Sequence, residues 1–183
     1  MQFLIKGDRY IADVKLQDKR LFTFKLDTGS PFTVISLSTF CRMAHYSDKD
    51  KAKSWLLGAN PVGAFSYTKH MSRLTPVYIR NVSIDGTVIP KMYLFVNVDF
   101  ENSSSLIGTD FISACYALRT KADYCIELDK PDMAIYEDTF FRRCKKKDVP
   151  EIFELESEPV KTRSIASMFD AAGGGLNKDR PIV

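Results

Sequence analysis

The sequence has little of what metal sites and membrane spans require. Its four cysteines, Cys41, Cys115, Cys125 and Cys144, have no CxxC spacing, and only two histidines could join them as metal ligands. We therefore expect no metal site, and free thiols that are mostly buried, as in proteins of a reducing compartment. No apolar stretch approaches the length of a membrane span, so we expect no membrane association.

The excess of positive over negative charge is also small, because the formal net charge is only +3, and the basic residues are dispersed. Such a balance does not favour nucleic acid as a partner. The run RRCKKK, residues 142–147, is the exception; we interpret it as a solvated exit from the domain, with nucleic-acid binding as the weaker alternative. The opening MQFLIKGDRY is typical of a first strand and not of a secretion signal, so we expect a cytoplasmic protein.

Alternating apolar and polar residues are typical of strands over most of the chain. They predict a hairpin around residues 17–20 and a second one at Asp85-Gly86, a pair that favours a tight turn. Between these hairpins, capping residues and mixed apolar spacing over residues 38–57 predict one or two short helices. The pattern indicates a mainly β domain.

Sequence patterns in the C-terminal third of the chain indicate where this domain ends. A short helical patch follows SLIGTDFI, and two closing strands are expected, the second of them at AIY, residues 134–136. We therefore expect one domain at residues 1–138 and a tail at residues 139–183 with too few clustered apolar groups for a second core. The tail could add strands to a dimer interface, occupy a cleft, be a processing remnant or be disordered.

The stretch FKLDTGSPFTVIS places Asp27 between two apolar runs. Asp27 could belong to an ordinary β-turn, but turns are usually flanked by polar residues, which favours a different role here. Asp-Thr-Gly-Ser after a strand, a glycine-bearing hairpin region, and then Leu106-Ile107-Gly108 occur in the order that resembles the retropepsins, a family of aspartic proteases. The resemblance covers most of the chain and implies a retropepsin-like closed β-barrel, the acid protease fold, with a single lobe.

The resemblance also implies roles for the residues of this loop. Asp27 would be the catalytic carboxylate, Thr28 would hydrogen-bond across a two-fold axis, and Gly29 would let backbone approach the carboxylate and the substrate. Ser30 would donate its hydroxyl to the carboxylate and favour its ionised form. Peptide hydrolysis needs one carboxylate as base and one carboxylic acid, and the chain has one such loop, so the second Asp27 would come from another copy.

A flap that covers the substrate is expected near Gly63, where a Gly-X-aromatic segment is typical of a hairpin. The residues expected to contact the substrate are Gly63, Ala64, Phe65 and Tyr67 in this segment and Ser30 in the Asp27 loop. A surface loop without substrate contact is the alternative. The strand expected at MQFLI is a candidate for the dimer interface, where it would add to the sheet of the partner.

Two places depart from the family's pattern, since Pro31 and Thr109 stand where retroviral members carry a paired Asp and Arg. The contacts of that pair cannot be carried over. We predict a homodimeric aspartic endopeptidase that acts on protein or peptide substrates, with no cofactor because water is the nucleophile. The alternative is a catalytically silent module of the same fold that binds peptides as a dimer or serves as a scaffold.

Overall fold

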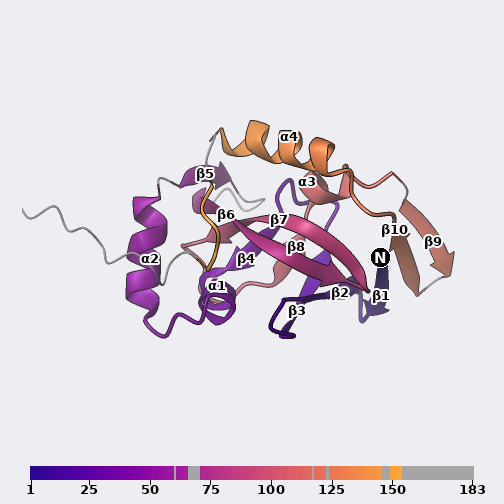
Figure 1. The fold of residues 1–183 in the computed structure, drawn as a ribbon, viewed down its shortest axis with the longest axis horizontal. Helices are drawn as coiled ribbons and strands as arrows, with labels where there is room; N and C mark the ends of the chain where they lie inside the picture. Colours follow the sequence, from indigo (N-terminus) through magenta and orange to yellow (C-terminus); the bar gives the residue numbers. More distant parts are fainter. Residues whose placement is uncertain (60, 66–70, 117, 123, 146–148, 154–183) are drawn as a thin grey trace, which may run out of the picture.

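The computed structural model describes residues 1–59, 61–65, 71–116, 118–122, 124–145 and 149–153 (Figure 1). Within these residues the helices are α1 (Leu37–Met43), α2 (Lys49–Gly58), α3 (Thr109–Ile112) and α4 (Met133–Cys144). The strands are β1 (Gln2–Lys6), β2 (Arg9–Lys15), β3 (Leu21–Leu26), β4 (Val34–Ser36), β5 (Val62–Phe65), β6 (Met71–Ile84), β7 (Thr87–Asn97), β8 (Ser105–Ile107), β9 (Leu118–Ala122) and β10 (Cys125–Leu128). None of the helices in these ranges is long and apolar enough to cross a membrane.

The strands form one sheet that closes on itself. Its order is β5-β6-β7-β4-β8-β3-β2-β1-β10-β9, and β6 also pairs with β2. This extra pairing joins β2, β3, β8, β4, β7 and β6 into a closed six-stranded barrel. Closure removes the free edges of those six strands, and the mainly β closed barrel expected from the sequence is confirmed.

The two hairpins expected from the sequence are confirmed. β2 and β3 pair antiparallel on either side of residues 16–20, and β6 and β7 pair over nearly their full length. Asp85 and Gly86 both have positive φ, at 47° and 76°. Two consecutive positive φ values match the twist of the flanking strands, which explains why an Asp-Gly pair closes this hairpin.

The two helices expected between residues 38 and 57 are also present, as α1 and α2. Each begins at a capping side chain: Ser36 accepts from the amide of Thr39, and Asp48 accepts from the amides of Asp50 and Lys51. These bonds satisfy amides that have no partner within the helix.

The strand predicted at residues 134–136 is wrong, because these residues lie in helix α4. Asp132 caps α4 by accepting from the amides of Ala134 and Ile135. Tyr136, Phe140 and Cys144 follow at intervals of four and are all buried, so the apolar spacing has the helical period and not that of a strand.

Helix α4 also runs through the boundary expected at residue 138, so residues 139–144 belong to it. Beyond the helix, Ile152 is fully buried, and its amide donates to the carbonyl oxygen of Tyr78 on β6. Residues 149–153 therefore pack on the barrel, and the remainder of the expected tail, residues 154–183, lies outside the described residues.

Strand β1 lies inside the sheet and not at its edge. It pairs with β2 on one side and with β10 on the other. Residues 2–4 pair with β10 and residues 4–6 with β2, so β1 is not a free edge strand, and the addition of MQFLI to a partner's sheet stays a prediction that these pairings do not support. Among the described strands, β5 and β9 end the sheet order.

Aromatic side chains fill the space between the barrel and α4, which lies beside α3 along the upper side of the barrel in Figure 1. The Tyr93 ring contacts the rings of Tyr136, Phe140 and Phe141 at centroid distances of 5.6, 4.6 and 5.4 Å. The Tyr136 hydroxyl donates to the carbonyl oxygen of Tyr93 at 2.7 Å and accepts from the Tyr93 amide at 3.1 Å. One phenol thereby satisfies both backbone groups of a residue in β7.

Tyr136→Phe is expected to lower the free energy of unfolding by about 1–3 kcal/mol, because it leaves two buried backbone groups without a partner. Urea denaturation measures the change. Tyr124→Phe is the matched control, since Tyr124 is 63% exposed and its loss of a hydroxyl should change stability by less than about 0.5 kcal/mol. Equal effects of the two substitutions would contradict the role given to the Tyr136 hydroxyl.

Candidate active site

Asp27 is positioned by the parallel pairing of β3 with β8. Leu26 lies opposite Ile107 in this pair, and the Asp27 amide donates to the carbonyl oxygen of Ile107 at 3.0 Å. The chain then turns, and the Gly29 amide donates to Oδ1 of Asp27 at 2.9 Å. The half-buried carboxylate is thus held at the end of a barrel strand by its own loop.

The second half of the loop forms hydrogen bonds with α3 and within itself. The Thr109 amide donates to the carbonyl oxygen of Ser30 at 2.8 Å. The Ser30 hydroxyl donates to the carbonyl oxygen of Phe32 at 2.7 Å. Because a hydroxyl has one proton, the expected donation from Ser30 to the Asp27 carboxylate does not occur in this arrangement, and Ser30 shapes the loop instead.

Gly108 lies where a side chain has no room. A Cβ built at Gly108 would lie 2.3 Å from the carbonyl oxygen of Phe32 and 2.8 Å from that of Ser30. Both atoms belong to the backbone of the Asp27 loop. The glycine of the Leu-Ile-Gly segment therefore allows the two segments to contact each other.

A buried acid joins the same two segments. Asp110 is fully buried, and its carboxylate accepts from the Thr33 amide at 2.9 Å and from the Thr33 hydroxyl at 2.7 Å. The Thr33 hydroxyl also accepts from the Gly108 amide at 3.1 Å. Burial raises the pKa of the Asp110 carboxyl, and the hydrogen bonds from Thr33 oppose this effect.

Arg143 reaches this cluster from α4. Its guanidinium lies 3.4 Å from Oγ1 of Thr109 and 6.0 Å from the centroid of the Phe32 ring. Its positive charge also lowers the pKa of Asp110, against the larger effect of burial. Arg142 pairs with Asp138 at 2.9 Å, so the arginines of the basic run belong to the end of a helix.

A pocket of about 640 Å³ opens at the Asp27 loop. Its walls come from the loop, from β6 and from the segment that follows β7, and they are lined by Asp27, Gly29, Ser30, Pro31, Phe32, Val34, Ser72, Leu74, Asn97, Phe100, Ser103, Ser104 and Leu106. Among these described residues Asp27 alone carries a carboxylate, and none is a histidine, cysteine, lysine or arginine.

The structure places Asp27, Gly29 and Ser30, three of the predicted site residues, in the lining of the pocket. The Thr28 side chain is exposed, beside the pocket. Gly63 lies inside β5, opposite Arg73, so Gly63 is within a strand of the expected hairpin, and residues 66–70, which join the two strands, lie outside the described residues.

The other residues predicted for the flap are only partly described. Ala64 and Phe65 pair with Ser72 and Met71 in the β5–β6 hairpin. Tyr67 lies outside the described residues. Ser72 lines the pocket, which places the described part of this hairpin at its wall.

The cysteines take no part in this site. All four are free, and Cys41, Cys125 and Cys144 are buried. Burial raises the pKa of the Cys115 thiol to about 12, which keeps it protonated and unreactive at neutral pH. The described residues contain no cluster of His, Cys, Asp and Glu that could hold a metal ion.

Sequence reasoning missed the residues that support the loop, namely Thr33, Asp110 and Arg143. Asp110 had a visible signal, since an acid inside the apolar run LIGTDFI is buried only when it is hydrogen-bonded. Arg143 had none, because its contact with Thr109 depends on the helical path of α4.

No family model matches the sequence, and no curated protein matches it. Among solved structures, the chain is similar to the crystal structure of a retropepsin-like aspartic protease from Rickettsia conorii. The two share 13% sequence identity at a TM-score of 0.49, and the alignment covers 70% of this chain and 88% of that chain. A likeness at this level assigns no activity to the chain.

Gly108→Ala is expected to lower the free energy of unfolding by about 1–3 kcal/mol, because the added methyl group would displace the backbone of the Asp27 loop. Gly58→Ala is the matched control: no atom lies within 4 Å of the added group, and alanine favours the helix by up to about 1 kcal/mol. Urea denaturation of both variants measures the difference. A Gly108→Ala protein as stable as Gly58→Ala would contradict the close contact.

Asp110→Asn is expected to lower stability by about 1–3 kcal/mol, because its amide group would face a donor of Thr33. Because the folded-state pKa of Asp110 is raised, the folded wild type binds this proton more tightly, and the contribution of Asp110 to stability falls as pH rises above the ordinary range of an aspartate. The variant lacks this titration, so its deficit should be larger at pH 4.5 than at pH 7.5.

Urea denaturation at both pH values tests this sign. Asp13→Asn is the control at pH 7.5, since Asp13 also accepts from a threonine hydroxyl, that of Thr23 at 2.6 Å, but in an exposed position. Its loss should stay below about 0.5 kcal/mol. A deficit of Asp110→Asn that grows with pH would contradict the burial effect.

Proposed function

We propose that this chain is one subunit of a homodimeric aspartic endopeptidase that hydrolyses peptide bonds in protein or peptide substrates. The observation that carries the proposal is the single carboxylate of Asp27, held by the Gly29 amide in a pocket whose described lining offers no other acid or base. Hydrolysis by an activated water needs both a base and an acid. A second copy of the chain supplies the missing carboxyl group.

A two-fold axis beside the loop would bring the two Asp27 carboxyl groups together, since residues at such an axis face their own copies. Thr28, Gly29 and Pro31 are exposed at this face of the subunit. No described residue hydrogen-bonds the Thr28 hydroxyl, which leaves it available to the partner's loop. Like charges at short distance favour one shared proton, so one Asp27 stays ionised while the other is protonated.

In this dimer the ionised carboxylate takes a proton from water as the water attacks the peptide carbonyl, and the protonated Asp27 donates to the carbonyl oxygen. The proton taken from water then passes to the leaving amine as the C–N bond breaks, and one hydroxyl of the tetrahedral intermediate returns its proton to the second Asp27, which restores the shared proton. No cofactor is required, because water is the nucleophile. The β5–β6 hairpin, whose residues Ser72 and Leu74 line the pocket, serves as the flap over the substrate.

The partners that follow from this proposal are a second copy of the chain and a peptide segment, with no nucleic acid and no membrane. A cytoplasmic location suits the four free thiols.

Asp27→Asn is expected to lower cleavage of a diverse peptide library by at least about 100-fold, because the variant loses its proton-transfer groups. Mass spectrometry identifies the cleaved peptides from pH 4 to pH 8, and sedimentation measures the dimer fraction of each protein. Asp8→Asn is the control, since the Asp8 side chain is 86% exposed and lies outside the pocket lining.

Cleavage by the wild type and Asp8→Asn, but not by Asp27→Asn at an equal dimer fraction, supports the proposal. Equal cleavage by all three proteins contradicts it. Absence of cleavage by a well-formed wild-type dimer, together with peptide binding, would instead assign the chain to the silent peptide-binding module.

A further inference from the structure

Two further hollows lie in series beside the Asp27 pocket. The first, of about 500 Å³, shares Ser103 and Ser104 with the Asp27 pocket, and we call it the serine hollow. The second, of about 770 Å³, shares Ser38 and Arg42 with the serine hollow, and we call it the basic pocket. Because neighbouring hollows share lining residues, the three adjoin one another from Asp27, past α1, to the turn between β2 and β3, and we call this series of hollows the groove.

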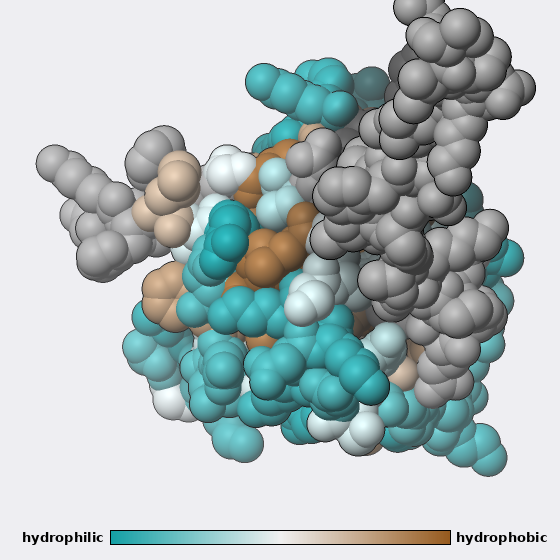
Figure 2. Space-filling model, turned by 90° about the vertical axis from the view of Figure 1, so that its left-hand side faces the viewer, coloured by the Kyte–Doolittle hydropathy of each residue, from teal (hydrophilic) through white to brown (hydrophobic). Residues whose placement is uncertain are grey.

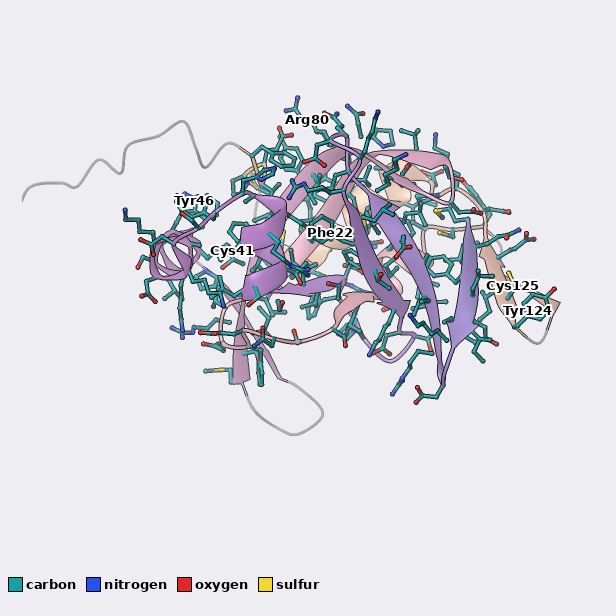
Figure 3. The ribbon with its side chains drawn as sticks, turned by 90° about the horizontal axis from the view of Figure 1, so that it is seen from below. Phe22, Cys41, Tyr46, Arg80, Tyr124 and Cys125 are labelled. Carbon is teal, nitrogen blue, oxygen red and sulfur yellow. The ribbon has the colours of Figure 1, made fainter. Side chains whose placement is uncertain are left out.

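The ionisable side chains on the wall of the basic pocket are mainly basic. Arg20, Arg42, His45 and Lys49 face it, together with the ring of Phe22, and no aspartate or glutamate is among its described lining residues. Figure 3 places Cys41 and Tyr46 toward the end of the molecule that carries α1 and α2 and Phe22 nearer its middle, all three far from Tyr124 and Cys125. This end has a mainly hydrophilic surface, with hydrophobic residues recessed among polar ones (Figure 2).

Three of these four groups already face a carboxylate. Asp18 accepts from Arg20 at 2.6 Å and lies 3.4 Å from the ring of His45. Lys49 lies 3.7 Å from Glu101. Arg20 also donates to the carbonyl oxygens of Arg42 and Met43 at the end of α1, which gives it a structural role.

Arg42 differs from the other three, because no described carboxylate forms an ion pair with it. Its guanidinium lies 5.4 Å from the centroid of the Phe22 ring and 3.4 Å from Oγ1 of Thr39. These contacts hold an exposed guanidinium in place, and an arginine held in this way loses less entropy when it binds a carboxylate through two hydrogen bonds. Arg42 lines both the serine hollow and the basic pocket.

We propose that this groove extends the substrate cleft and that Arg42 binds an aspartate or glutamate side chain of the substrate at a fixed number of residues from the cleaved bond. The inference rests on the proposed function and adds to it a substrate class, peptides with an acidic residue on one side of the cleavage site. An extended strand is the form in which a peptide follows such a groove, at about 3.3 Å per residue. The serine hollow supplies hydroxyl groups for its backbone.

The experiment starts from one peptide that the wild type cleaves. A single glutamate is moved through every position on both sides of the cleaved bond, and each peptide is compared with its glutamine counterpart. At one position, kcat/KM is expected to be about two- to fivefold higher for glutamate than for glutamine. The ratio should fall as NaCl is raised from about 0.05 to 0.5 M, since salt screens exposed charges.

Arg42→Met is expected to bring this ratio to about one, because the variant lacks the charge that binds the glutamate. Arg9→Met is the matched control, because Arg9 is an exposed arginine that lines neither the basic pocket nor the serine hollow. It should keep the wild-type ratio. A wild type that cleaves but prefers glutamate at no position, or a preference that survives in Arg42→Met, overturns the inference and leaves the proposed function standing.

Peptide binding to the Asp27→Asn variant tests the acidic preference of the groove separately from the proposed peptidase activity. Fluorescence anisotropy with the labelled glutamate and glutamine peptides measures the preference without cleavage. A preference for glutamate that Arg42→Met abolishes in this background supports the groove even if the wild type proves inactive. Equal binding of the two peptides overturns it.

Discussion

The arrangement of the candidate site depends on one buried cluster, in which the Asp110 carboxylate binds the amide and hydroxyl of Thr33. These bonds join the segment after Asp27 to α3, and Gly108 lets the two backbones meet. A buried carboxylate is unfavourable unless it is hydrogen-bonded, so the cluster has one satisfied arrangement. The Asp27 loop is held in place by this cluster together with its own hydrogen bonds.

Helix α4 adds a second layer to the same support. Tyr136 satisfies both backbone groups of Tyr93 in β7, and Arg143 extends from the end of α4 to Thr109 and the Phe32 ring. Closure of the barrel and the docking of α4 thus stabilise the two segments beside Asp27, namely the loop that follows β3 and helix α3. In the proposed dimer this rigid base leaves the β5–β6 hairpin to open and close.

Local patterns in the sequence predicted the parts of the fold that local physics decides. The Asp85-Gly86 turn, the capping residues of α1 and α2, and the strand before Asp27 were all visible as residue types at fixed spacing. The segment at residues 134–136 was misread, because three apolar residues fit a strand as well as a helix. The pairing of β1 on both sides and the shared walls of the groove depend on long-range packing, which no local pattern carries.

The central claim is that one active site contains Asp27 from two copies of the chain. Wild type and Asp27→Asn can be refolded together in varying proportion at constant total concentration, and the cleavage rate measured. A shared site requires two intact copies, so the rate should follow the square of the wild-type fraction and fall to about a quarter in an equal mixture. A rate that falls in direct proportion, to about half, would show that each chain acts alone and would contradict the account.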